Sequence, residues 1–236
     1  MKSVFVTGGS GAVGSAIVRT MTRYGWRVAF SYNRSAQKAE ALAAQSGATP
    51  YQVDLEDEEA VCAMAKKLES EFGIPDALVN NAGATSIIPF ALLEAEDWDQ
   101  AMSANLKSMF LVTHALIRGM IRRKKGAVVN MSSLAGQRVL GVPVTYAASK
   151  SGVVGFTIGL AREVARYGIR VNAVAPGMLD DGVSANVPEQ EREEYLRYCL
   201  AGRPGRCEEV AELIEFLCGE RSSYINAQLI HINGGL

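Results

Sequence analysis

The sequence predicts a doubly wound α/β fold, in which helices cover both faces of a parallel sheet of about seven strands within a single domain, residues 1–236. Three observations support this fold class. Short runs rich in Val, Ile, Phe and Tyr alternate with longer stretches of helical character along the chain. These runs read as apolar on both sides, as strands of a parallel sheet require. A glycine-rich turn, "TGGSGAVG", joins the first run to the first helical stretch.

The elements follow one another regularly until the last quarter of the chain. Residues 178–205 break the alternation, because this segment is polar, irregular and bounded by Pro and Gly. Long segments of this kind often cover active sites, so we predict a substrate lid here. We expect helices near residues 12–24, 35–46, 56–72, 94–122, 145–167 and 207–219, and strands in "SVFVTG", "RVAFSY", "TPYQVD", "DALVNNAG", "GAVVNMSS", "IRVNAVAPG" and "AQLIHING".

Composition argues against several classes of protein. With 48% hydrophobic residues, 21% charged residues and a formal net charge of -1, the chain has no disorder signature and no general attraction to nucleic acid or anionic membranes. We expect neither a signal sequence nor a membrane span, because no apolar run is long enough. The four cysteines form no CxxC pair and only two histidines are present, so neither disulfides nor a metal site is expected. The sequence therefore predicts a cytoplasmic protein.

The glycine-rich turn matches the G-x-G-x-x-G pattern of dinucleotide sites through Gly9, Gly11 and Gly14. Glycines there allow a tight turn and let backbone N–H groups approach a pyrophosphate at the N-terminus of the next helix. Plain strand-to-helix turns can show the same pattern. Its position after the first strand of an alternating chain favours a dinucleotide site.

The ends of the next two strands indicate which dinucleotide is bound. NAD sites usually place a carboxylate after the second strand to bind the ribose 2′-hydroxyl, whereas this chain reads "FSYNRS". Arg34, with the hydroxyls of Ser31 and Ser35, suits a 2′-phosphate, so we expect NADPH rather than NADH; the alternative is an ordinary solvated arginine. Asp54 is expected to cap the next helix, to accept a hydrogen bond from the adenine amino group, or both.

Tyr146 and Lys150 lie four residues apart in "YAASK", within a predicted helix. Residues four apart share one helical face, so we expect the ammonium of Lys150 to lie beneath the phenol of Tyr146 and to lower its pKa. Such a tyrosine can give a proton to the alkoxide that forms when hydride is transferred to a carbonyl. The lysine can also bind the nicotinamide ribose. Because a Tyr and a Lys four residues apart also occur by chance, a catalytic role for this pair requires other polar groups nearby.

Polar residues at other strand ends provide such groups. Ser132 and Ser133 end "VVNMSS" at the edge where open α/β sheets bind ligands, and a hydroxyl there can stabilise charge that develops on a substrate carbonyl. The alternative is a serine that simply ends a strand in a turn. Asn80, Asn81 and Asn105 lie in apolar surroundings, and buried amides need partners, which fits a cofactor-lining turn and an ordered-water relay.

These motifs together resemble the short-chain dehydrogenase/reductase family. "TGGSGAVG", "NNAG", "NLKSMF", "NMSS", "YAASK", "VNAVAPG" and "INAQLIHINGG" occur in the order and spacing of that family, from about residue 3 to residue 235. The resemblance implies a Rossmann-like fold and an NAD(P)-dependent oxidoreductase. Within the family the chain is most similar to the 3-oxoacyl-[acyl-carrier-protein] reductases, through "AREVARYGIRVNAVAPG" and the end of the second strand.

The resemblance also implies the residues of the site. The catalytic tetrad would be Asn105, Ser133, Tyr146 and Lys150, with Ser133 rather than Ser132 matching the family serine. The cofactor would be bound by Gly8, Ser10, Gly11, Val13, Gly14, Tyr32, Asn33, Arg34, Ser35, Asp54, Leu55, Asn81, Ala82, Gly83, Tyr146, Lys150, Pro176 and Gly177.

Three positions depart from the family pattern. Ala12 stands where a glycine of the nucleotide turn is usual, and Gly11 stands where NADPH-preferring relatives often carry a basic residue. Asp181 replaces a threonine that binds the nicotinamide end of the cofactor. Because a carboxylate repels a pyrophosphate, we expect the loop around Asp181 to take another path.

The resemblance implies partners as well. In the family, the long helices near 94–122 and 145–167 usually pack across a two-fold axis, so a homotetramer is expected. The basic cluster from Arg118 to Lys125, with Arg166 nearby, is either a solvated helix end or a docking surface for an acidic acyl carrier protein. Neither nucleic acid nor a membrane is an expected partner.

The leading hypothesis is NADPH-dependent reduction of a 3-ketoacyl thioester on a carrier protein, in fatty-acid or polyketide-type biosynthesis. The alternative is a dehydrogenase or reductase of a small secondary alcohol, sugar or cyclic ketone, and a non-catalytic dinucleotide-binding regulator is the third hypothesis. The lid at 178–205 decides between the two enzymes, whereas the complete tetrad favours an enzyme over a regulator.

Overall fold

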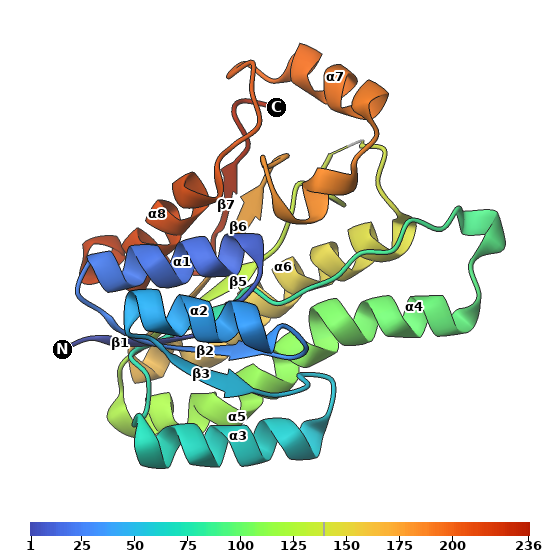
Figure 1. The fold of residues 1–236 in the computed structure, drawn as a ribbon. Helices are drawn as coiled ribbons and strands as arrows, with labels where there is room; N and C mark the ends of the chain where they lie inside the picture. The colour runs from blue at the N-terminus through green and yellow to red at the C-terminus, as the bar shows by residue number, and fades with distance from the viewer. Residues whose placement is uncertain (139) are drawn as a thin grey trace.

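The structure, a computed structural model, describes residues 1–138 and 140–236. Seven parallel strands form one sheet in the order β3-β2-β1-β4-β5-β6-β7, with helices on both faces (Figure 1). The predicted doubly wound fold and its number of strands are confirmed. The strands are β1 (Ser3–Val6), β2 (Arg27–Tyr32), β3 (Thr49–Gln52), β4 (Ala77–Asn80), β5 (Gly126–Met131), β6 (Ile169–Pro176) and β7 (Leu229–Ile232).

Each face of the sheet packs against its own set of helices. In β1, Val4 and Val6 enter one hydrophobic core while Phe5 enters the other, because successive side chains of a strand point to opposite faces. Burial on two faces therefore explains the apolar runs in the sequence. One face is covered by α1 (Ala12–Arg23), α2 (Ala36–Ser46) and α8 (Cys207–Cys218), and the other by α3 (Glu58–Glu71), α5 (Ser108–Arg123) and α6 (Val144–Val164).

The strand order reverses between β1 and β4. β2 and β3 lie on one side of β1, and β4 to β7 lie on the other. Open α/β sheets bind ligands outside the carboxyl ends of the strands at such a switch point. The turn after β1 and the ends of β4, β5 and β6 share this edge, because all these strands run parallel. The predicted motifs are therefore gathered at one place.

The helix predicted near 94–122 is interrupted. It consists of α4 (Ala95–Met102), a π-helical turn (Ser103–Lys107) and then α5. Single π turns replace the regular hydrogen-bond ladder locally and occur often at functional sites. Asn105 is the buried residue of this turn. The irregularity therefore coincides with a predicted catalytic residue.

The segment predicted as an irregular lid contains a helix, α7 (Glu189–Tyr198), which follows a 3₁₀ turn (Gly182–Asn186). Its sequence, "EQEREEYLRY", contains no buried residue. Without an apolar stripe a helix gives no periodic signal, so the prediction of an irregular segment is wrong for α7. The role of residues 178–205 as a lid stays a prediction. Further 3₁₀ turns are Phe90–Leu92, Ala165–Tyr167 and Glu220–Ser222.

Buried amides and hydroxyls connect the sheet to two of its helices. Asn80 Nδ2 on β4 donates to Asn130 Oδ1 on β5 and to Thr113 Oγ1 on α5, each at 2.8 Å. Asn130 Nδ2 donates in turn to Thr157 Oγ1 on α6 at 2.9 Å. Each of these residues is at most 4% exposed. The bonds hold α5 and α6 in fixed positions against β4 and β5.

The longest helix in the described part of the chain is α6, with 21 residues, and it buries polar residues that include Ser149 and Lys150. Over residues 1–138 and 140–236, no helix has both the length and the apolar character that crossing a membrane requires.

Candidate active site

The turn after β1 is shaped by close backbone approaches. Gly8 has a left-handed backbone with φ of 65°, and a Cβ on Gly14 would lie only 2.1 Å from the carbonyl oxygen of Gly8. A Cβ on Gly9 would lie 2.6 Å from the side chain of Phe30 on β2. Packing therefore requires glycine at these positions. A Cβ on Gly11 would make only an ordinary contact, at 3.4 Å.

The first turn of α1 leaves its backbone N–H groups without side-chain partners. Gly11 caps the helix without a side-chain hydrogen bond, and no acidic residue lies in the first turn. Free N–H groups and the positive end of the helix dipole attract phosphate at such a position. Ser10 precedes this cap, and Ala12 and Val13 begin the helix. The groups present therefore fit the pyrophosphate of a dinucleotide.

Thr7 connects the nucleotide turn to the segment after β4. Its Oγ1 accepts from the N–H groups of Asn81, at 2.9 Å, and Ala82, at 3.0 Å. Asn81 Nδ2 donates back to the carbonyl oxygen of Thr7 at 2.9 Å. These contacts bring the predicted residues Asn81 and Ala82 to the turn. The sequence did not predict this role of Thr7. Its only indication in the sequence is the position of Thr7 directly before the glycines of the turn.

The residues predicted to bind a 2′-phosphate differ in their surroundings. Ser31 is 1% exposed, and its Oγ accepts a hydrogen bond from the N–H of Gly8 at 3.1 Å. The prediction for Ser31 is therefore wrong, because its hydroxyl supports the nucleotide turn from within. Arg34 and Ser35 are exposed after β2, between Asn33 and the start of α2. Their role, like that of half-buried Tyr32, stays a prediction.

Asp54 does not cap α3. Its Oδ1 accepts from the N–H of Glu56 at 3.0 Å, whereas the helix is capped by Asp57, which accepts two backbone hydrogen bonds from the first turn. The capping alternative for Asp54 is wrong because the chain makes one further turn before the helix begins. Asp54 is exposed and Leu55 half-buried beyond the end of β3. Their contact with an adenine stays a prediction.

Lys150 is buried where β5 ends. The residue is 3% exposed, and its Nζ donates to the carbonyl oxygen of Met131 at 3.0 Å. The same Nζ lies 5.7 Å from the ring centroid of Tyr146. The hydroxyl of Ser133 is close enough to the Tyr146 phenol to act on its pKa. Three predicted catalytic residues therefore meet at the carboxyl edge of the sheet.

Asn105 approaches this group from the π turn. Its Oδ1 accepts from the N–H of Ala84 at 3.0 Å, and its Nδ2 donates to the carbonyl oxygens of Ala84 and Ala101 at 2.8 and 3.1 Å. Protein partners therefore occupy both donors of the amide and one acceptor site of its oxygen, and the water relay stays a prediction. A Cβ on Gly83 would lie 2.6 Å from Asn105 Oδ1 and 3.2 Å from Lys150 Nζ. Gly83 thus lies between the amide and the ammonium.

Burial controls the protonation of the Tyr146 and Lys150 pair. It lowers the pKa of Lys150 to about 8, because a buried ammonium loses its hydration. Burial also raises the pKa of Tyr146, and the hydroxyl of Ser133 opposes this change with a smaller effect. The predicted lowering of the Tyr146 pKa is therefore wrong for this structure, because desolvation of the phenolate outweighs any effect of the ammonium. Tyr146 is a protonated acid at neutral pH.

The two neighbouring serines have different surroundings. Ser132 is 2% exposed and donates from Oγ to the carbonyl oxygen of Lys150 at 2.9 Å. Ser133 is half-buried, accepts from the N–H of Ala135 at 3.1 Å and acts on the pKa of Tyr146. Ser132 therefore fixes α6 to the end of β5. This arrangement supports Ser133 as the hydroxyl that faces a substrate.

The end of β6 lies beside the segment that follows Ser132 and Ser133. The carbonyl oxygen of Pro176 accepts from the N–H of Leu134 at 3.1 Å. Gly177 follows, and its N–H donates to the carbonyl oxygen of Ile232 on β7 at 3.0 Å. Pro176 and Gly177 therefore reach the same edge as the tetrad, as a contact with the nicotinamide end of a cofactor requires.

The loop around Asp181 does not avoid the nucleotide turn. A Cβ on Gly182 would lie 3.6 Å from the Cβ of Ala12, in the first turn of α1. The predicted detour is therefore wrong, because the bridge between Leu179 and Gly205 leads the chain back toward α8, which packs on α1. The carboxylate of Asp181 is exposed and accepts from the N–H of Gly182 at 2.6 Å.

Comparison with known proteins gives matches along the whole chain. A family model described as enoyl-(acyl carrier protein) reductase matches residues 9–236. The 3-oxoacyl-[acyl-carrier-protein] reductase FabG of Staphylococcus aureus (strain Mu50) is 36% identical over 242 residues, covering 100% of this chain and 98% of the relative. The protein of the same name from Escherichia coli (strain K12) is 33% identical over 237 residues, covering 100% and 97%.

A solved structure shows the same fold. The crystal structure named ribose-5-phosphate isomerase from Brucella melitensis 16M aligns with a TM-score of 0.92 at 27% sequence identity, covering 99% of this chain and 92% of that chain. The seven-stranded architecture of this chain is therefore shared along its full length.

The fold, the glycine turn at the switch point and the buried Tyr146 and Lys150 pair define an oxidoreductase that uses a nicotinamide dinucleotide. The chain belongs to the short-chain dehydrogenase/reductase family.

We expect Lys150→Met to stabilise the protein at pH 7. The folded-state pKa of about 8 lies below the ordinary value of 10.5, so below pH 8 the folded protein bears the full penalty of a buried ammonium. A shift of this size corresponds to about 3 kcal/mol. Between pH 8 and 10.5 the unfolded chain binds the extra proton, so wild-type stability rises with pH and the advantage of the variant shrinks.

Urea unfolding of both proteins across this pH range measures the difference in free energy. A variant that is less stable than wild type at pH 7 would contradict the expectation, and would show that the hydrogen bond to Met131 outweighs the penalty of burial.

Proposed function

We propose that this protein reduces the ketone of a 3-ketoacyl thioester, held on an acyl carrier protein, to the 3-hydroxyacyl thioester with NADPH. The reaction would serve fatty-acid or polyketide-type biosynthesis in the cytoplasm, where the four free cysteines stay reduced. The observation that carries the proposal is the end-to-end likeness, at 33% and 36% identity, to proteins named 3-oxoacyl-[acyl-carrier-protein] reductase. It is supported by a complete tetrad whose members lie together.

The protein's own groups suit proton delivery to the substrate oxygen. A dinucleotide bound at the turn after β1 would supply the hydride. Tyr146, which its raised pKa keeps protonated, can give its proton to the alkoxide as charge develops there. Ser133 is placed to hydrogen-bond the same oxygen. The ammonium of Lys150, 5.7 Å from the ring centroid, stabilises the phenolate that remains.

The end of β2 supports NADPH as the cofactor. Arg34 is exposed and forms no ion pair within residues 1–138 and 140–236. A free guanidinium can bind a phosphate through two parallel hydrogen bonds. Ser35, the N-cap of α2, has a side chain without a capping hydrogen bond and can join it. The structure thus offers a cation and a hydroxyl to a 2′-phosphate.

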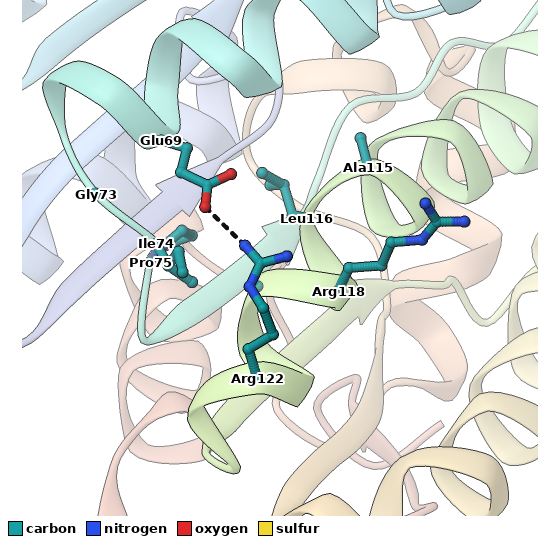
Figure 2. Close-up of a pocket in the computed structure, with 9 residues that line it drawn as sticks. Glu69, Gly73, Ile74, Pro75, Ala115, Leu116, Arg118 and Arg122 are labelled. Atoms are coloured by element: carbon teal, nitrogen blue, oxygen red, sulfur yellow. Dashed lines mark hydrogen bonds and ion pairs between the residues drawn. The ribbon is translucent and has the colours of Figure 1, made fainter.

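The basic cluster from Arg118 to Lys125 is partly neutralised. Figure 2 shows Arg122 directed at Glu69 beside a cavity of about 110 Å³, with Arg118 on the neighbouring helical turn. In the described structure, Arg118 and Lys124 have no ion-pair partner. Three other cations of the cluster are paired: Arg122 with Glu69 at 2.7 Å, Arg123 with Asp76 at 2.7 Å and Lys125 with Glu220 at 3.1 Å.

We propose Arg118 and Lys124 as the contacts for an acidic carrier protein, because free exposed cations are what electrostatic steering needs. The cluster lies at the far end of α5 from Asn105. Between Asn105 and Lys124 the chain rises about 28 Å at roughly 1.5 Å per helical residue. A carrier protein docked at this cluster would therefore have to reach the site along the length of α5.

Exposed apolar side chains support assembly into a homotetramer. Trp98 on α4, Phe110 on α5 and Ile158 on α6 are 43%, 46% and 52% exposed. Large exposed apolar groups mark surfaces that another chain can cover. We propose that copies of this chain associate through these helices.

A second candidate is reduction of a small polar ketone, such as a sugar or cyclic ketone. This candidate rests on α7, whose ten residues include four glutamates and no buried residue. A long acyl chain needs an apolar channel, which such a helix does not line. The lid therefore favours a short or polar substrate over a long acyl chain.

The proposed function predicts oxidation of NADPH by an acetoacetyl thioester, with NADH as the poorer donor. We expect Arg34→Ala to lower the preference for NADPH about tenfold or more, because a charge-assisted hydrogen bond is lost. Absorbance of the reduced nicotinamide measures both rates. Turnover of a sugar or cyclic ketone without turnover of the thioester would select the second candidate instead.

We expect Tyr146→Phe to reduce turnover by about 10² to 10⁴, the usual contribution of a general acid. Binding of NADPH should change little, because phenylalanine keeps the ring and loses only the hydroxyl. Steady-state rates and a fluorescence titration with NADPH give the two quantities. A variant with the wild-type rate would exclude Tyr146 as the proton donor.

We expect the double change Arg118→Glu and Lys124→Glu to raise the KM for an acetoacetyl carrier protein several-fold at low salt. The effect should fade as ionic strength increases, because salt screens exposed charges. The same variant should reduce a small acetoacetyl thioester without carrier at the wild-type rate. An unchanged KM for the carrier substrate would remove this surface as the docking site.

A further inference from the structure

Tyr195, near the C-terminal end of α7, and Cys199, its C-cap residue, attach this helix to the rest of the protein. The two residues are four positions apart, so they lie on one side of the helix. Cys199 is 6% exposed and Tyr195 is half-buried, whereas most other residues of this mainly charged helix are exposed. These two side chains anchor the C-terminal end of the helix.

The hydroxyl of Tyr195 binds the chain directly after β6. Its oxygen accepts from the N–H of Met178 at 3.0 Å, and it lies 3.4 Å from the carbonyl oxygen of Asn233, to which it donates. A Cβ on Gly177 would lie only 2.1 Å from this hydroxyl oxygen. Glycine is therefore required at position 177 for the phenol to reach the backbone.

Cys199 fixes the end of the same helix to the chain after β7. Its Sγ lies 3.5 Å from the carbonyl oxygen of Gly234, and a Cβ on Gly234 would lie 2.7 Å from this sulfur. The N–H of Ala201 donates to the same carbonyl oxygen at 2.9 Å. Tyr195 and Cys199 thus hold α7 at the ends of two neighbouring strands.

The other end of α7 reaches toward the catalytic helix. The carboxylate of Glu191 lies 3.6 Å from where a Cβ on Gly141 would be, in the segment that leads into α6 and Tyr146. In Figure 1, α7 lies beyond the carboxyl ends of β6 and β7. The helix therefore spans from the end of β6 to the approach of the catalytic helix.

The backbone that Tyr195 binds is also part of the catalytic edge. Pro176, two residues before Met178, accepts from the N–H of Leu134, which follows the catalytic Ser133. Gly177 is a predicted contact for the nicotinamide end of the cofactor. The phenol of Tyr195 thus joins α7 to the turn at Gly177 and Met178. This turn lies next to the segment of Ser133 and is a predicted contact of the cofactor.

We propose that Tyr195 is a positioning residue, whose hydroxyl holds α7 closed and fixes the Gly177 and Met178 turn in the form that binds the nicotinamide end of the dinucleotide. This proposal rests on the dinucleotide cofactor of the proposed function. Burial raises the pKa of Tyr195, so the hydroxyl stays protonated and keeps both hydrogen bonds at neutral pH. Since closure of α7 and cofactor binding favour the same form of the turn, loss of the hydroxyl weakens both together.

The test compares Tyr195→Phe with Tyr198→Phe. Tyr198 lies on the same helix but is 64% exposed, and its side chain forms no hydrogen bond among the described residues. Tyr195→Phe keeps the ring and leaves the Met178 N–H without its acceptor. Trypsin cleavage at Arg192 and Arg197, followed by mass spectrometry, reports opening of α7, and nicotinamide fluorescence reports binding of NADPH.

We expect Tyr195→Phe to accelerate cleavage within α7 about tenfold and to raise both the Kd and the KM for NADPH by a similar factor, as loss of these hydrogen bonds implies. We expect kcat and the midpoint of global unfolding to remain near wild type. Tyr198→Phe should match wild type in every measurement, because its hydroxyl has no hydrogen-bond partner in the part of the chain that the structure describes.

Two results would overturn the proposal. Unchanged cleavage would show that the hydroxyl does not hold the helix, and faster cleavage with an unchanged Kd would show a lid anchor that does not position the cofactor. The cleavage and Kd measurements need no substrate. If wild-type protein binds NADPH but reduces no thioester, the proposed substrate fails while the role of Tyr195 is still decided.

Discussion

Burial of the parallel sheet on both faces determines where chemistry can occur in this protein. Because helices cover the two faces, side chains along the inner strands enter hydrophobic cores, and groups that meet a ligand must lie where strands end. Thr7, Asn81, Ser133 and Gly177 follow β1, β4, β5 and β6 at one edge. Asn105 and the first turns of α6 reach the same edge from the helical layer. The site is therefore a consequence of the topology.

Behind this edge, most buried polar groups have protein partners; among the described residues, Asn80 Oδ1 is the buried side-chain atom that has none. The bonds between Asn80, Asn130 and the two threonines fix the helices, and a buried group left without its partner costs about 1–3 kcal/mol, so few alternative arrangements are available. Lys150 is different, because burial opposes its charge even though Met131 accepts its hydrogen bond. Its retention at such a site is understandable if the ammonium is needed for proton transfer, since active sites commonly sacrifice stability for function.

Glycines, which have no Cβ, allow the parts of the site to approach one another closely. Gly14 leaves room for the carbonyl of Gly8, Gly83 for the side chains of Asn105 and Lys150, and Gly177 for the hydroxyl of Tyr195. Gly14, Gly83 and Gly177 do not have a left-handed backbone. Their requirement for glycine thus comes from contacts across the fold, which the sequence around each glycine does not reveal.

The sequence by itself determined the doubly wound fold, the dinucleotide turn and the pairing of Tyr146 with Lys150, because these features depend on local periodicity, local turns and spacing within one helix. Only the tertiary structure decided which polar groups already have hydrogen-bond partners within the protein and which remain available to a ligand. The hydroxyl of Ser31 accepts a hydrogen bond from the N–H of Gly8, 23 residues away, and the hydroxyl of Tyr195 accepts one from the N–H of Met178, 17 residues away. The direction of the Tyr146 pKa shift also depends on burial, which no spacing along the chain specifies. Helix α7 was not predicted for a related reason. It contains no buried residue, and the contacts of Tyr195 and of its C-cap residue Cys199 depend on the ends of β6 and β7.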